Sequence, residues 1–320
     1  MEKTKTRKKL FHAQTIFRFA PVIGLVLLVA FFAIASDGRS VSTVNLKILF
    51  NQVVLTALIS IGGIFAFTSG ALDMSMSGSV CCTAIVAAKL GTATGSTEVM
   101  LLTCVAMGLL LGLLKAGFSI YMNVPSFMIT IVLGMALSSL GNVLLGSQSN
   151  LSVSDLVGTG QRTMLYVVML FVFYAIAAVI FQYSTFGKGA KIVGGNPRAA
   201  DQTGINASKV KLYAFLLGGV GIALTSIVVL MRSKSVNAST AGSLGMDMMV
   251  AIVLGGMPLA GGAKSKISAA LIGAAIITVL NNGLMVIGVD SGVIQLVRGI
   301  LFLVVVYITG FSYRTDLLPR

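Results

Sequence analysis

The chain alternates long apolar runs with short polar segments. Ten apolar runs occupy residues 18–35, 48–68, 78–90, 98–120, 126–146, 164–183, 212–231, 246–261, 267–287 and 292–310. A helix that crosses a bilayer needs about 20 apolar residues, so the pattern predicts an all-α integral membrane protein with about ten transmembrane helices. The third and eighth runs are short, which indicates broken helices completed by irregular backbone inside the protein. The predicted parts are a basic tail at 1–17, a single transmembrane domain at 18–310 and a tail at 311–320.

Composition supports a lipid environment. Hydrophobic residues make up 56% of the chain and charged residues 10%, whereas a soluble domain carries about 25% charged residues. The net charge of +14 comes from basic residues in the gaps between apolar runs, so nucleic acid is rejected as a partner. With the N-terminus inside, 16 of the 23 basic residues fall in inner segments and six in outer ones. Because inner loops are rich in Lys and Arg, both termini and the loop 184–211 are predicted to be cytoplasmic.

The loop 184–211 contains a short polar segment with the signals of a capped helix, "GGNPRAADQTGI". Asn196 is a favourable N-cap, Pro197 suits the first helical position and Gly204 can end the helix. The segment predicts a helix at 196–204 that presents its charged side chains to the cytoplasm. Such a helix either docks on another protein or lies on the membrane surface, and its apolar residues are too few for strong membrane binding.

Chemistry for catalysis or ATP hydrolysis is missing from the sequence. The stretch "GGMPLAGGAKSK" at 255–266 lacks the Gly-Lys-Ser/Thr ending of a phosphate-binding loop, because Lys264 does not directly follow the second glycine pair. The single histidine, His12, lies in the N-terminal tail, and the three cysteines lie in apolar runs without metal-type spacing. No catalytic residue, metal site or bound cofactor is therefore predicted for this chain.

A few polar residues do fall within or beside the apolar runs. Asp73 and Ser75, in "SGALDMSMSGS", indicate an interrupted helix, where Asp73 either caps a helix or lines a transport path. Arg298 either extends to the membrane surface or pairs with a buried acid. Asn281 and Asn282 either hydrogen-bond between helices or bind a hydroxylated ligand.

Five motifs occur in one order along the chain: "LDMSMSGS", "NVPSFMIT", "VGGNPRAADQTGI", "VLGGMPLAGG" and "NNGLMVIGV". Together, over about residues 45–310, they resemble the permease subunit of bacterial ABC importers of the ribose, xylose and galactose class. Two features depart from that family: one extra residue stands between Asp73 and the Gly-Ser at 78–79, and "AKSK" follows "AGG" where the family often has Arg-Gly.

The resemblance implies an importer with separate parts in the bacterial inner membrane. Its expected partners are a second permease subunit, identical or related, a cytoplasmic ABC ATPase that carries ATP and Mg²⁺, and a periplasmic or lipoprotein substrate-binding protein. By resemblance, the ATPase-coupling helix comprises Gly194, Gly195, Asn196, Pro197, Arg198, Ala199, Ala200, Asp201 and Gly204. The candidates for the translocation path are Asp73, Ser75, Asn281, Asn282 and Arg298. A bulky residue at Gly195, or leucine at Asn196, is expected to uncouple ATP hydrolysis from uptake.

Two other functions remain open at this stage. An ion-coupled secondary carrier would use Asp73 and Arg298 as coupling residues. An ABC permease of the same superfamily would carry nucleosides, furanose-type signalling molecules or branched-chain amino acids.

Overall fold

The computed structural model describes residues 20–122, 124–158, 163–258 and 261–314, with side chains up to residue 307. Apolar helices occupy all ten predicted places, and seven of them are long and apolar enough to cross a membrane. Those seven are α2 (Thr43–Thr68), α3 (Met76–Thr94), α4 (Thr97–Tyr121), α5 (Ser126–Leu145), α7 (Thr163–Tyr183), α10 (Ala207–Ser233) and α12 (Ser268–Val286). The three shorter apolar helices are Ala20–Ala35, α11 (Leu244–Leu254) and α13 (Ser291–Arg314, described fully to Tyr307).

Several small elements connect these helices. They are the 3₁₀-helix η1 (Arg39–Val41), the strands β1 (Leu151–Ser152) and β2 (Ser235–Val236), and the short helices α6 (Ser154–Val157), α8 (Thr185–Gly195) and α9 (Pro197–Gln202). The two strands pair antiparallel, Leu151 with Val236 and Ser152 with Ser235. Polar side chains start many of the helices: the side chain of Ser42 accepts from the Asn45 amide and that of Asn206 from the Lys209 amide. Such caps satisfy backbone donors that no helical carbonyl reaches.

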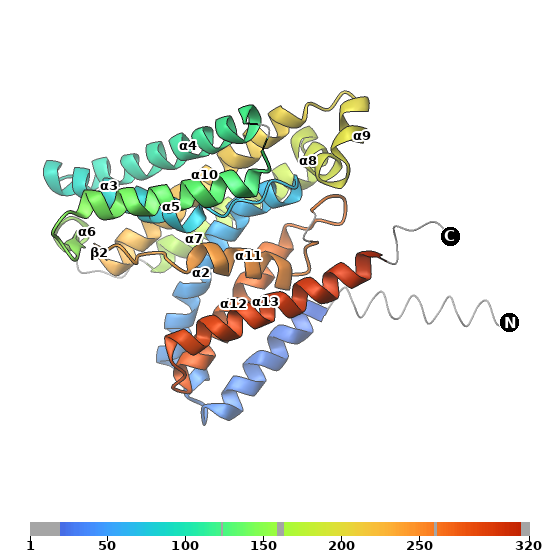
Figure 1. Ribbon diagram of the computed structural model, residues 1–320. Coiled ribbons are helices and arrows are strands. Elements are labelled where there is room, and N and C mark those ends of the chain that lie inside the picture. The colour runs from blue at the N-terminus through green and yellow to red at the C-terminus, as the bar shows by residue number, and fades with distance from the viewer. Residues whose placement is uncertain (1–19, 123, 159–162, 259–260, 315–320) are drawn as a thin grey trace.

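The two central helices are α2 and α10. Of the most apolar 18-residue window of each helix, 67% is buried in α2 and 78% in α10, against 17% in α5 and 28% in α7. In Figure 1, α3, α4 and α5 flank this centre on one side, and Ala20–Ala35, α12 and α13 on the other. The helices α5 and α7 therefore lie at the periphery, where many of their apolar side chains are exposed.

Glycine allows the central helices to pack closely. A Cβ on Gly219 of α10 would collide with the Gly108 carbonyl of α4, and a Cβ on Gly221 would lie 2.8 Å from Cα of Gly62 in α2. A Cβ on Gly112 would lie 2.7 Å from the Phe215 carbonyl oxygen. Small residues at such crossings bring backbones into direct contact, which drives helix association in membranes. These glycines therefore let α10 pack directly against α2 and α4.

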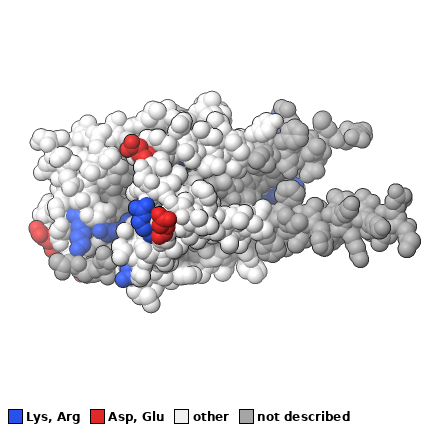
Figure 2. Space-filling view, turned by 90° about the horizontal axis from the view of Figure 1, so that it is seen from below, with Lys and Arg blue, Asp and Glu red and all other residues white. Residues whose placement is uncertain are grey.

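The outer surface matches a lipid solvent. Many large apolar side chains are exposed on α4, α5, α7 and α13, among them Val132 at 66% and Phe171 at 61%. Figure 2 shows one face on which most of the visible Lys, Arg, Asp and Glu side chains gather toward one end, while much of the other described surface is white. In Figure 1 the first turn of Ala20–Ala35 and the last turn of α13 point toward the end of the bundle that carries α8 and α9.

The structure corrects several predicted boundaries. The third helix is not short, because α3 has 19 residues and qualifies as a span. The loop 184–211 is largely helical and contains the unpredicted helix α8 before α9. The fold is almost all-α, with the two-residue β ladder as an addition. The helix α13 continues into the predicted tail at 311–320, while the tail 1–17 lies outside the described residues.

Candidate translocation cavity and coupling surface

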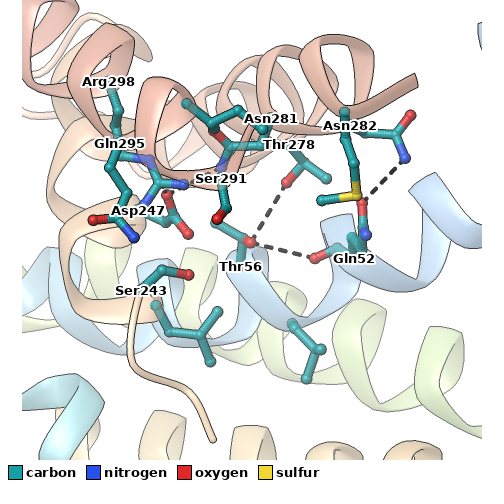
Figure 3. Close-up of a pocket in the computed structure, with 14 residues that line it drawn as sticks. Gln52, Thr56, Ser243, Asp247, Thr278, Asn281, Asn282, Ser291, Gln295 and Arg298 are labelled. Atoms are coloured by element: carbon teal, nitrogen blue, oxygen red, sulfur yellow. Dashed lines mark hydrogen bonds and ion pairs between the residues drawn. The ribbon is translucent and has the colours of Figure 1, made fainter. Parts of the chain in front are cut away.

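A polar cavity of about 290 Å³ lies between α2, α11, α12 and α13. Figure 3 shows its polar side chains in a row: Arg298, Gln295 and Asp247 at one side, Thr56 and Thr278 in the middle, and Gln52 and Asn282 at the other. The other lining residues are Leu55, Ser243, Leu244, Asn281, Met285, Ser291 and Ile294. Four helices that are otherwise apolar thus direct polar groups to one place, which is how ligand sites are built inside membrane domains.

An ion pair forms one wall of this cavity. Nε of Arg298 lies 3.0 Å from Oδ1 of Asp247, and the two side chains are 9% and 7% exposed. The amide Nδ2 of Asn281 donates to the same Oδ1 at 3.2 Å. Of the two predicted alternatives for Arg298, the structure shows the pairing with a buried acid. Asn281 Oδ1 is buried and has no hydrogen-bond partner among the described residues, so an acceptor remains for a ligand.

Amides and hydroxyls form the opposite wall. Asn282 and Asn45 exchange two hydrogen bonds, at 2.8 and 3.2 Å, and Asn282 also reaches Gln52 at 3.5 Å. The hydroxyl of Thr278 lies 3.4 Å from that of Thr56. Asn282 therefore does hydrogen-bond between α12 and α2, while it also lines the cavity. Gln52 and Thr56 were missed in the sequence because a single polar residue in an apolar run gives no signal of the face it occupies.

Asp73 belongs to a different place. It lies in the irregular segment between α2 and α3, where its Oδ1 accepts from the amide and hydroxyl of Ser75 at 2.9 and 2.6 Å. Its Oδ2 receives Nζ of Lys115 from α4 at 3.0 Å, with side-chain exposures of 1% and 2%. The predicted interruption of the helix is present, and neither Asp73 nor Ser75 lines the polar cavity. Lys115 is one of the 16 basic residues that the inside-positive pattern places on the cytoplasmic side, and it is instead buried inside α4.

The predicted polar helix is present as α9. Oδ1 of Asn196 accepts from the amides of Arg198 and Ala199 at 3.1 and 3.2 Å, Pro197 is the first helical residue and Gly204 has a φ of +76°. Arg198 and Asp201 are exposed. Ala200 is fully buried in a small core with Ala190, Val193 and Val210. The apolar side of α9 therefore packs inside the protein, and a lipid-bound orientation has no apolar face left to use.

A junction of backbone atoms joins α8 to the rest of the fold. A Cβ on Gly194 would collide with the Thr68 carbonyl oxygen at the end of α2. The amide of Gly262 donates to that same oxygen at 2.9 Å, and Gly262 has a φ of +90°. In contrast, a Cβ on Gly195 would meet nothing within 4 Å. An added side chain would therefore meet a neighbouring backbone at Gly194 and open space at Gly195.

Among the described residues, no three of His, Cys, Asp and Glu come together as metal ligands. Cys81, Cys82 and Cys104 are buried and free. They pack in the protein interior, as their apolar surroundings in the sequence predict.

The fold and its cavity define a multi-pass membrane protein of the transport class. Residues 45–306 match the family described as the permease component of the branched-chain amino acid transport system. The match spans most of the chain, and the chain belongs to this family. It is thus a permease component rather than a catalytic enzyme, and family membership favours the ABC permease over the ion-coupled carrier.

Three bacterial relatives carry related names. The chain is 36% identical to the "Probable ABC transporter permease protein YphD" of Escherichia coli over 190 residues, which cover 58% of this chain and 57% of the relative. It is 28% identical to the ribose import permease protein RbsC of Bacillus subtilis, covering 95% and 97% of the two chains. It is 26% identical to the xylose transport system permease protein XylH of Haemophilus influenzae, covering 90% and 94%.

A solved structure supports the fold. A chain of an ABC transporter described as metal-chelate type, in an inward-facing conformation, superposes with a TM-score of 0.52. The superposition covers 89% of this chain and 98% of the other, at 13% identity. At this identity the similarity bears on the fold alone, and it agrees with the arrangement of helices in Figure 1.

Proposed function

We propose that this chain is the membrane-spanning subunit of an ATP-driven importer of pentose sugars in the bacterial inner membrane. The observation that carries the proposal is the polar cavity of about 290 Å³ inside a member of a permease family. The two relatives matched over nearly their whole length are named for ribose and xylose. Both sugars are neutral five-carbon polyols, so the proposed substrate class is a neutral pentose.

The chemistry of the cavity suits such a substrate. Asp247 and Arg298 neutralise each other, so the lining offers hydrogen-bonding groups without net charge. Sugar hydroxyls both donate and accept, and the amides of Asn281 and Gln52 do the same. Ligand pockets commonly measure roughly 300–1,000 Å³, and a cavity just below that range is large enough for a monosaccharide.

Branched-chain amino acids are the second candidate because the family description names them. A zwitterionic amino acid would place its ammonium and carboxylate against Asp247 and Arg298 and compete with the ion pair between them. A neutral sugar leaves that pair intact. The pair therefore favours the sugar, and direct competition between the two substrates tests the choice.

Energy would enter through α9. The proposed ATPase docks on its exposed charges, Arg198 and Asp201, and a second permease subunit provides the other half of the path. Movement of α9 would pass through Gly194 to the end of α2 and to Gly262 in the segment between α11 and α12. Because α2, α11 and α12 line the cavity, such movement would exchange an outward opening for an inward one. A substrate-binding protein would deliver the sugar to the outward opening.

The test is reconstitution of this permease with its ATPase and binding protein, identified by co-purification in mild detergent. Vesicles that contain ATP should accumulate radiolabelled ribose or xylose, whereas vesicles with a non-hydrolysable analogue should not. Unlabelled leucine should not compete. Uptake driven by a sodium or proton gradient without the ATPase would overturn the proposal. Competition by leucine would show that the substrate is a branched-chain amino acid and not a pentose.

A further inference from the structure

A second polar pocket, of about 250 Å³, lies among α7, α8 and the start of α12. We name it the basic pocket; its lining is Tyr174, Phe181, Gln182, Lys191, Ser265, Lys266, Ile267 and Ser268. It shares no residue with the polar cavity, whose lining comes from α2, α11, α12 and α13. The basic pocket belongs to the end of the bundle that carries α8 and α9 (Figure 1).

Two lysines and no carboxylate line this pocket. Within the described part of the chain, Lys191 and Lys266 make no ion pair with an acidic side chain. The ammonium of Lys191 lies 4.4 Å from the centre of the Phe181 ring, and burial lowers the pKa of Lys191. A partly desolvated cation without an acidic partner is stabilised when an anion binds beside it.

Ser265 provides the second observation. Its side chain is 5% exposed, and its Oγ is buried without a hydrogen-bond partner in the described structure. Buried hydroxyls are normally paired, because an unmet donor loses its bonds to water. Ser265 is one of the residues that line the basic pocket, so a ligand oxygen bound there could supply the missing partner.

The start of α12 adds a third attraction for an anion. The N-cap position of this 19-residue helix is Ile267, whose side chain makes no capping hydrogen bond. Helix N-termini carry partial positive charge and bind phosphate through backbone amides. Ile267 and Ser268 both line the pocket, which places this helix start beside the two lysines and Ser265.

We infer that the basic pocket binds an anionic phosphate group, held by Lys191, Lys266, Ser265 and the start of α12. Two sources share this chemistry: the headgroup of an anionic phospholipid and a free phosphate. Tyr174 and Phe181 lie on α7, a peripheral helix whose apolar window is 28% buried, and basic pockets on the cytoplasmic side of membrane helices bind acidic lipids. Because α8 leads directly into α9, a bound phosphate group would connect α7 and α12 to α9, where the ATPase is proposed to dock.

The experiment uses the full chain, delipidated in detergent. One arm titrates phosphatidylglycerol in mixed micelles against phosphatidylcholine, and the other titrates inorganic phosphate against chloride at constant ionic strength; thermal unfolding is the readout. An upward Tm shift with phosphatidylglycerol alone assigns the site to lipid, and a shift with phosphate assigns it to a free anion. No shift with either ligand overturns the inference.

Variants locate the binding. Lys191→Gln and Lys266→Gln should each weaken binding about fivefold, as expected for loss of one lysine near an anionic headgroup. Lys209→Gln, an exposed lysine of α10 outside the pocket, is the matched control and should bind like the wild type. Ser265→Ala should lose the ligand-induced shift while its ligand-free Tm stays the same or rises, because an unpaired buried hydroxyl is removed.

Equal binding by Lys209→Gln and the two pocket variants overturns the assignment to this pocket. So does a Ser265→Ala variant with an undiminished shift. If no ligand shifts the Tm but the lysine variants no longer co-purify with the ATPase, the lysines bind a carboxylate of the ATPase instead. The phosphate site is then rejected. Because the readout is binding to this chain alone, its failure leaves the proposed sugar transport untouched.

Discussion

Two buried ion pairs with the same 3.0 Å separation lie in opposite surroundings in this protein. Asp73 and Lys115 are sealed at the end of α2, and Asp73 also receives two hydrogen bonds from Ser75. Asp247 and Arg298 border a cavity of about 290 Å³ whose lining also contains amide and hydroxyl side chains. A charge pair inside a membrane protein thus indicates a ligand site only where it borders space that a ligand can enter. The sealed pair holds the irregular segment before α3 in place.

The largest effect is expected from Lys115→Met. The change leaves the Asp73 carboxylate buried without its counter-ion, and removal of one partner of a buried pair costs about 3–5 kcal/mol. We expect little folded protein and a strongly lowered Tm, measured by size-exclusion chromatography and thermal unfolding in detergent. The double variant Asp73→Asn/Lys115→Met should recover much of the loss. A single variant as stable as the wild type would contradict a structural role for the sealed pair.

The next effect concerns the junction at the same end of the molecule. Gly194→Val forces a side chain into the Thr68 carbonyl, whereas Gly195→Val points into open space. Both carry the same change in helix propensity, so the neighbour provides the matched control. We expect Gly194→Val to lose most ATP-driven uptake and Gly195→Val to keep it, measured as sugar transported per ATP hydrolysed. Equal losses in the two variants would show that contact with α2 does not transmit the movement.

Asp247→Asn tests the pair that borders the cavity. Hydrogen bonds to charged groups contribute roughly 1.5–3 kcal/mol, so uptake of pentose should fall about tenfold or more. The Tm should change less than in Lys115→Met, because water that enters the cavity can solvate Arg298. Initial uptake rates and thermal unfolding of the same preparations measure both effects. A large fall in Tm together with normal uptake would show that the Asp247–Arg298 pair stabilises the fold and does not take part in transport.

The smallest effect is expected from Thr278→Val. Its hydroxyl makes a long contact of 3.4 Å with Thr56, and the substitution preserves the shape of the side chain. Uptake should stay within about twofold of the wild type, since a weak hydroxyl contact contributes little net free energy. Initial uptake rates measure the change. A loss as large as that in Asp247→Asn would mean that this hydroxyl touches the sugar directly.

Features that depend on local sequence were predictable. The apolar runs place all ten apolar helices, and Asn196, Pro197 and Gly204 give the start and end of α9 within a residue or two. These signals come from neighbours along one helix, so a pattern of hydrophobic and capping residues contains them. Close packing at Gly108 and Gly219 also has a local signal, because small residues recur at helical spacing around both positions.

Features that depend on distant partners were not predictable. Asp73 and Lys115 are 42 residues apart, and Asn45 and Asn282 are 237 apart. The residues next to Lys115 in the sequence do not distinguish a buried lysine from one at the end of a helix. The excess of basic residues in inner loops therefore assigns it to the cytoplasmic side. The role of Gly194 depends on Thr68 and Gly262, which come from other parts of the chain. Register between helices determines these contacts, and a single sequence does not contain it.

The contact of Gly194, Thr68 and Gly262 has a consequence for how such permeases diversify. It is built from backbone atoms, two glycines and one carbonyl oxygen, so an added side chain at Gly194 or Gly262 would disrupt it rather than adjust it gradually. The polar cavity, in contrast, is built from side chains. Under the proposed mechanism, single substitutions on α2, α11, α12 and α13 can change cargo preference while the proposed connection to the ATPase is inherited unchanged. An engineer who wishes to redirect uptake to a new sugar can treat the cavity as variable and the contact as fixed.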